Sequence, residues 1–191
     1  LIASLLGLVN LLPVYVLVTP GFAGHLSSGG MVLSRWLRQV ITNGLPVVFL
    51  VNYVGFFLFA VTMEKSRSVR ATVLFVVLDP LLRVVLFIAL HAVIYMLSAD
   101  WFGSFGGSKT TALDVVLPTL ARSAWFENIS GAYLYAVLLS ALPVYATVFD
   151  RLDGRGASPG HWPVRVWPWG VGVLTCAVCA ALLMGMGNIL L

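Results

Sequence analysis

Residues 71–97 read ATVLFVVLDPLLRVVLFIALHAVIYML, and this stretch decides the fold class. A helix needs about 20 apolar residues to cross a bilayer, and a longer run can tilt or project beyond the membrane. The stretch exceeds that length and contains only Asp79, Arg83 and His91 as ionisable groups apart from Tyr95. It therefore predicts a membrane-spanning helix with a few polar side chains inside the bilayer.

The composition of the whole chain agrees with this prediction. Of 191 residues, 60% are hydrophobic and 9% are charged, whereas a soluble domain carries about 25% charged residues. An ordinary water-soluble fold is excluded, and so is disorder, because disordered chains are rich in charge. The net charge of +4 is assigned to cytoplasmic loops and not to a nucleic-acid partner.

Four further segments are apolar enough to cross a bilayer. They are residues 1–18, 44–62, 131–149 and 169–191. The predicted fold is an all-α integral membrane protein, a single bundle of five transmembrane helices over residues 1–191. The connections that precede residue 71 and follow residue 149 are rich in Arg and Lys, which places them in the cytoplasm. The N-terminus is then inside and the C-terminus outside, in the inner membrane of a prokaryote.

Two of the connections have the pattern of short amphipathic helices. Residues 32–41 place apolar side chains on one face and Ser34, Arg35 and Arg38 on the other, between the breaks Gly29-Gly30 and Asn43-Gly44. Residues 112–124 show a weaker pattern, interrupted by Pro118. We predict two interfacial helices on the outer side, which either rest on the membrane or form a lid or docking shelf.

The helix predicted over 71–97 carries the best candidates for chemistry. Asp79 and Arg83 are four residues apart and share a helix face, as do His91 and Tyr95. An internal ion pair between Asp79 and Arg83 would offset the cost of burying two charges. Two interpretations stay open. These residues line a polar path for a proton or an anion, or they fix how this helix docks, with His91 bonded to a nearby carbonyl.

The sequence does not predict a metal site or a catalytic set. His91 is the one histidine inside a predicted span, so a haem bound there would need its second ligand from another chain. Cys176 and Cys179 lie within an apolar helix and are interpreted as buried thiols. Glu127 stands near the mouth of a predicted span, but no known catalytic motif accompanies it.

Other residues indicate packing between helices. Ala177, Ala181 and Gly185 are four residues apart on the last predicted span and form a stripe where another helix can approach. Asn10 and Asn52 are polar residues in the middle of spans and are expected to hydrogen-bond across helices.

Three classes of function remain. The first is a non-catalytic structural or accessory subunit of a larger membrane complex, and this class is favoured because the loops are short and catalytic motifs are missing. The second is a small proton- or ion-coupled transporter or channel that uses Asp79 and Arg83. The third is a membrane enzyme acting on lipid or quinone at the outer face. The expected partners are the lipid bilayer and other membrane subunits or further copies of the chain, without nucleic acid.

Overall fold

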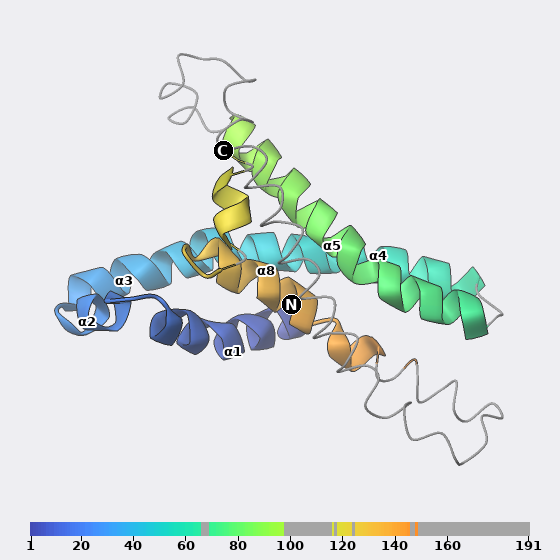
Figure 1. Cartoon of the computed structure of the whole chain (residues 1–191), viewed down its shortest axis with the longest axis horizontal. Coiled ribbons are helices and arrows are strands. Elements are labelled where there is room, and N and C mark those ends of the chain that lie inside the picture. Colours follow the sequence, from blue (N-terminus) through green and yellow to red (C-terminus); the bar gives the residue numbers. More distant parts are fainter. Residues whose placement is uncertain (66–68, 98–115, 117, 124, 146–147, 149–191) are drawn as a thin grey trace, which may run out of the picture.

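The computed structural model describes residues 1–65, 69–97, 116, 118–123, 125–145 and 148 (Figure 1). Within them every regular element is a helix, and there is no strand. The elements are α1 (Ile2–Val18), α2 (Phe22–Ser27), α3 (Gly30–Gln39), the π-helical turn η1 (Val40–Gly44), α4 (Leu45–Lys65), α5 (Val69–Leu97) and α8 (Ser130–Leu139). Residues 118–123 and 142–145 are helical as well. The predicted all-α class is confirmed for this part of the chain.

Two helices in the described residues are long and apolar enough to cross a membrane. They are Gly30–Thr62 and Leu74–Tyr95. The apolar helices Ile2–Val18 and Ser130–Tyr145 are shorter. The predicted span 169–191 lies outside the described residues, together with Cys176, Cys179, Ala177, Ala181 and Gly185.

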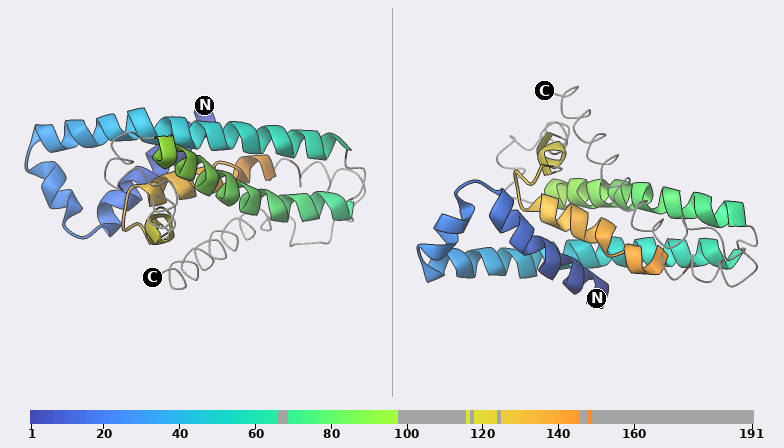
Figure 2. Two further views of the ribbon diagram at one scale, coloured as in Figure 1. Left: turned by 90° about the horizontal axis from the view of Figure 1, so that it is seen from above. Right: turned by 60° about the horizontal axis from the view of Figure 1, so that its bottom comes forward.

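The first predicted interfacial helix is not a separate helix. The chain begins α3 at Gly30, next to the predicted break, and then continues through η1 into α4. The three elements form one long rod in the views of Figures 1 and 2. The predicted break at Asn43-Gly44 is therefore wrong, and α3 extends α4 where we expected a helix lying across its end.

The π-helical turn explains how the chain stays helical through Gly44 and Pro46. Proline has no N–H to donate and its ring crowds the preceding turn. Directly before Pro46, the N–H of Leu45 bonds back five residues to the carbonyl of Val40. Gly44 is buried against the ring of Tyr133, which a side chain at this position would strike. Packing against α8 thus stabilises a helical conformation that the Asn-Gly pair alone does not favour.

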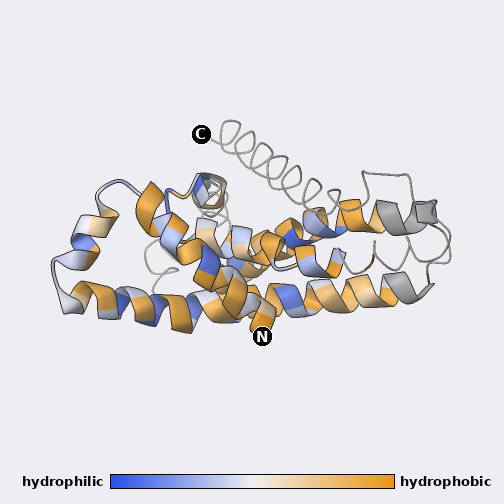
Figure 3. Ribbon diagram, turned by 90° about the horizontal axis from the view of Figure 1, so that it is seen from below, coloured by the Kyte–Doolittle hydropathy of each residue, from blue (hydrophilic) through white to orange (hydrophobic). Residues whose placement is uncertain are grey.

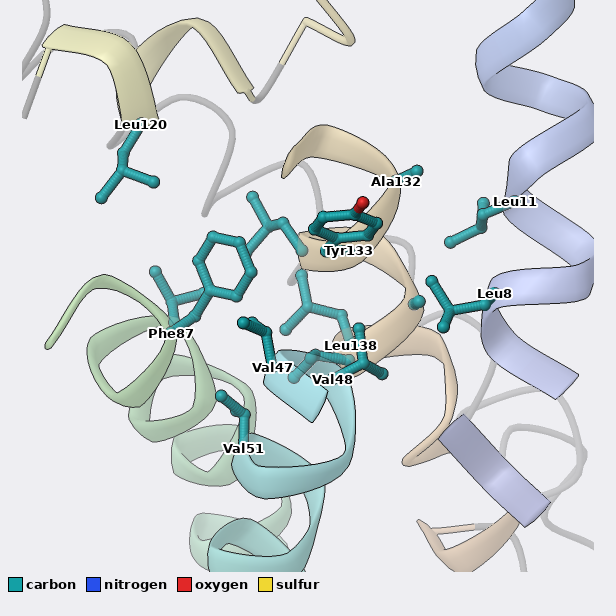
Figure 4. Packing of buried hydrophobic residues seen from close by; sticks show 14 of the residues in the cluster. Leu8, Leu11, Val47, Val48, Val51, Phe87, Leu120, Ala132, Tyr133 and Leu138 are labelled. Carbon is teal, nitrogen blue, oxygen red and sulfur yellow. The ribbon is translucent and has the colours of Figure 1, made fainter. Parts of the chain in front are cut away.

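The core surrounds α8. This helix packs against α1, α4 and α5, and the side chains of Ala132, Leu134, Ala136 and Val137 are fully buried. Figure 4 shows Leu8 and Leu11 of α1, Val47, Val48 and Val51 of α4 and Phe87 of α5 gathered around it. A helix that is apolar on all sides has this central position because no face of it needs water.

Val116 and Leu120 pack on this core. Val116 is 1% exposed and Leu120 is 2% exposed, and both belong to the cluster around α8. The described part of the predicted interfacial helix 112–124 is helical, at residue 116 and residues 118–123. Val116 and Leu120, which belong to its predicted apolar side, therefore contact protein, whereas a helix resting on the membrane would turn them toward lipid.

A turn at Ser140 and Ala141 separates α8 from the helical residues 142–145. The N–H of Val144 bonds back three residues to the carbonyl of Ala141. Pro143 has no N–H to donate to the carbonyl of Leu139, so the helix lacks one backbone hydrogen bond beside this turn. The hydroxyl of Ser140, at this interruption, lies in the interior of the bundle.

The outer faces of α1, α4 and α5 are apolar. Leu6 is 58% exposed, Phe57 is 59% exposed and Val85 is 61% exposed. Figure 3 shows that hydrophobic residues predominate along the long helices. A water-soluble monomer rarely exposes a continuous apolar surface of this kind to water, whereas lipid or a protein partner can cover it.

Candidate functional site

Asp79 and Arg83 form the ion pair expected from their spacing. The Nε of Arg83 donates to Oδ2 of Asp79 at 2.7 Å, within one face of α5. Arg83 is 0% exposed and Asp79 is 4% exposed. Charges removed from water this completely are tolerated only when they are paired and hydrogen-bonded.

Asn52 of α4 joins the ion pair to two other elements. Its side-chain oxygen accepts from Nη1 of Arg83 at 2.8 Å and from the hydroxyl of Ser140 at 2.9 Å. Its Nδ2 donates to the hydroxyl of Ser4 in α1 at 3.0 Å. The expectation that Asn52 bonds across helices is confirmed, whereas Asn10 lies on the exposed face of α1.

Tyr145 completes the group. Its hydroxyl donates to Oδ2 of Asp79, so this carboxylate oxygen accepts from two side chains. The ring of Tyr145 is buried and contacts the ring of Phe59. We call the six residues the polar network: Ser4, Asn52, Asp79, Arg83, Ser140 and Tyr145. It connects α1, α4, α5 and the chain that follows α8.

One face of α4 receives the guanidinium of Arg83. Its central carbon lies 4.3 Å from the centre of the Phe56 ring, in the geometry of a cation–π contact. A Cβ at Gly55 would lie 2.9 Å from the same carbon, so the close approach depends on glycine. Asn52, Gly55 and Phe56 are spaced i, i+3 and i+4, which places them on the same side of the helix.

Two polar atoms of the network have no hydrogen-bond partner among the described residues. They are Oδ1 of Asp79 and Nη2 of Arg83. Asp79 is also among the residues that line a cleft of about 390 Å³ between α4 and α5, where Thr62 is the other polar residue. An unpaired carboxylate oxygen that is this buried can accept a proton or a donor group.

His91 and Tyr95 lie apart from the network, farther along α5. His91 is 7% exposed, and its Nδ1 lies 2.9 Å from the carbonyl of Phe87. Its ring contacts that of Phe87, with ring centres 4.1 Å apart. The alternative in which His91 bonds a nearby carbonyl matches this geometry, and the carbonyl belongs to its own helix.

The sequence did not point to three members of the network. Ser4, Ser140 and Tyr145 are ordinary residues for apolar helices, and only the packing brings them to Asn52 and Asp79. A weak signal was present on α4, where Gly55 and Phe56 follow Asn52 at helical spacing and offer a place for a large planar cation.

The described residues contain no cluster of three or more His, Cys, Asp or Glu side chains that could hold a metal ion. Glu127 is more than half exposed and lies 3.9 Å from Arg122, an equally exposed partner. This contact is of the kind that contributes little to stability.

Comparison of the chain with protein-family models, curated proteins and solved structures finds no match. The chemistry of the chain must therefore be inferred from its own residues.

Proposed function

We propose that this chain is an integral membrane protein that serves as a non-catalytic subunit of a larger membrane assembly. The observation that carries the proposal is the polar network. Arg83 is hydrogen-bonded to Asn52 of α4, and Asp79 is hydrogen-bonded to Tyr145, which follows α8. Asn52 also bonds Ser4 of α1 and Ser140, so the network links the helices of the bundle to one another. Ionisable groups inside a membrane mark ion pathways by default, but here Oδ2 of Asp79 and the Nε and Nη1 groups of Arg83 are hydrogen-bonded to side chains of the protein itself.

The apolar outer faces support a partner as well as lipid. α1 and the residue before it expose eight large aliphatic side chains: Leu1, Ile2, Leu5, Leu6, Val9, Val14, Leu17 and Val18. Ala177, Ala181 and Gly185, which lie outside the described residues, are spaced so that the helix predicted over 169–191 would present a second surface for close helix approach. We propose that other membrane subunits cover part of this surface.

The proposed topology has five spans in a prokaryotic inner membrane, with the N-terminus inside and the C-terminus outside. A cysteine at Gly29 should then react with an impermeant maleimide from outside, and a cysteine at Ser66 only after the membrane is permeabilised. Both variants are made in a background with Cys176 and Cys179 replaced by Ser. Labelling of Ser66→Cys in intact cells would show that the orientation is the opposite of the proposed one.

The substitution Asp79→Asn tests the role of the ion pair. We expect it to lower the stability of the bundle or the yield of the assembly, because the neutral amide leaves the charge of Arg83 uncompensated. We expect any proton or ion flux of reconstituted vesicles to be unchanged. Asn10→Ala, on the exposed face of α1, is the matched control.

A second candidate function is a small proton- or ion-coupled transporter. The unpaired Oδ1 of Asp79 and the cleft that Asp79 lines between α4 and α5 favour it. If Asp79→Asn abolishes a measured flux while folding and assembly remain intact, this candidate replaces the subunit.

A further inference from the structure

A pocket lies beside His91, away from the polar network. Its volume is about 530 Å³, within the usual range for small-molecule sites. The lining residues come from the end of α3, η1, the start of α4, the end of α5 and the start of α8. His91 and Val47 are buried in its wall, whereas Thr42 and Asn43 are exposed.

The hydrogen bond of His91 fixes which ring nitrogen is available to a ligand. A carbonyl oxygen only accepts, so Nδ1 must carry the proton that it donates to Phe87. In the neutral ring Nε2 then has a free lone pair. The two nitrogens are separated by Cε1 and their outward directions diverge in the ring plane, so Nε2 points away from the carbonyl that binds Nδ1. The same arrangement orients histidines that act as ligands or bases.

Tyr133 is a second residue with a polar side chain that lines the same pocket. Its side chain is 4% exposed, and its hydroxyl has no hydrogen-bond partner among the described residues. A buried hydroxyl without a partner costs free energy, which an acceptor atom from a ligand would recover. His91 and Tyr133 both line the pocket, and the neutral ring of His91 has its one acceptor at Nε2.

The remaining lining is divided between polar and apolar residues. Gln39, Thr42 and Asn43 come from one stretch of chain, and two of them belong to the π-helical turn. Turns of this kind occur often at functional sites. The aliphatic walls and a further ring come from these residues: Leu50, Leu90, Ile94 and Tyr95. A ligand for this pocket needs a polar head group, an aromatic or flat body and an aliphatic part.

We propose that this pocket binds an amphiphile of the hydroquinone class, whose phenolic hydroxyl donates a hydrogen bond to Nε2 of His91. A phenolic hydroxyl is a good donor, and the neutral imidazole offers one acceptor for it. The ring of the ligand lies between the aromatic and aliphatic walls, and its chain leaves past Leu50 and Ile94, which are exposed. The site is independent of the polar network and of the proposed role as a subunit.

A matched pair of ligands tests the proposal on the wild-type protein. The full chain in detergent is titrated by calorimetry with 2-decylhydroquinone and with its dimethyl ether, which keeps the oxygen acceptors but has no hydroxyl hydrogen. We expect saturable binding of one hydroquinone per chain and affinity for the ether about ten-fold lower, as loss of one buried hydrogen bond implies. Equal affinity for the two compounds, or no saturable binding of the hydroquinone, would overturn the proposal.

A pair of variants tests the role of His91 itself. His91→Phe keeps a flat ring but removes Nε2, so we expect it to bind the hydroquinone about ten-fold more weakly and the ether unchanged. His25→Phe removes an exposed imidazole outside the pocket and should bind both compounds like the wild type. Undiminished hydroquinone binding by folded His91→Phe protein would contradict the proposal. If this variant does not fold, the two ligands on the wild-type chain still decide it.

Discussion

The substitution Arg83→Met is expected to lower the free energy of unfolding of the bundle by about 3 kcal/mol or more. It removes the guanidinium that pairs with Asp79 and leaves a carboxylate that is 4% exposed, with Tyr145 as its remaining donor. The side-chain oxygen of Asn52 loses one of its two donors at the same time. Unfolding of the purified protein in mixed micelles by increasing SDS, followed by circular dichroism, measures the change.

The double variant Asp79→Leu/Arg83→Met is the control for this prediction. It removes both charges together, and buried ion pairs can often be replaced by apolar residues with little loss of stability. We therefore expect the double variant to be more stable than Arg83→Met alone. A double variant that is as unstable as the sum of the two single variants would show that the charges contribute independently of each other.

The substitution Gly7→Val is expected to destabilise the bundle by about 2–3 kcal/mol. A Cβ at Gly7 would lie 2.8 Å from the carbonyl oxygen of Ala136 and 3.3 Å from its Cα. Both are backbone atoms of α8, so they cannot rotate aside, and α1 must move away from the core helix. The same SDS titration measures the loss.

Gly24→Val is the matched control, because Gly24 is also helical and a Cβ at this position would have no neighbouring atom within 4 Å. We expect the free energy of unfolding to change by less than about 1 kcal/mol, without a loss from helix propensity, because Val favours a helix more than Gly does. Equal effects at Gly7 and Gly24 would mean that the close contact of α1 with α8 is not needed for folding.

The parts of the fold that depend on local spacing could be predicted from the sequence. The pairing of Asp79 with Arg83 needs only a helix and a separation of four residues, and the apolar runs place α1, α4 and α5 within a few residues of their observed bounds. The prediction fails where contacts between distant parts of the chain determine the local backbone conformation. The break expected at Asn43-Gly44 is wrong because Tyr133, far along the chain, packs against Gly44.

In the candidate site, too, local features could be predicted from the sequence, whereas contacts between helices could not. Asn52 could be predicted as a residue that bonds across helices, because a lone amide in an apolar helix needs a partner. Its actual partners, Ser4, Arg83 and Ser140, come from three other places in the chain, and small hydroxyl residues give no signal until the helices are packed. Tyr145 bonds Asp79 across 66 residues of sequence, and this contact depends on how the helices pack, which helical periodicity does not reveal.

The most direct test of the proposed subunit role is native mass spectrometry of the chain after gentle detergent extraction from its own membrane. The proposal predicts that the chain emerges together with other polypeptides in a fixed stoichiometry, and that the complex dissociates when the apolar outer face of α1 is disrupted by Val9→Arg. A chain that emerges alone, or only with copies of itself, would contradict the subunit proposal and favour the transporter.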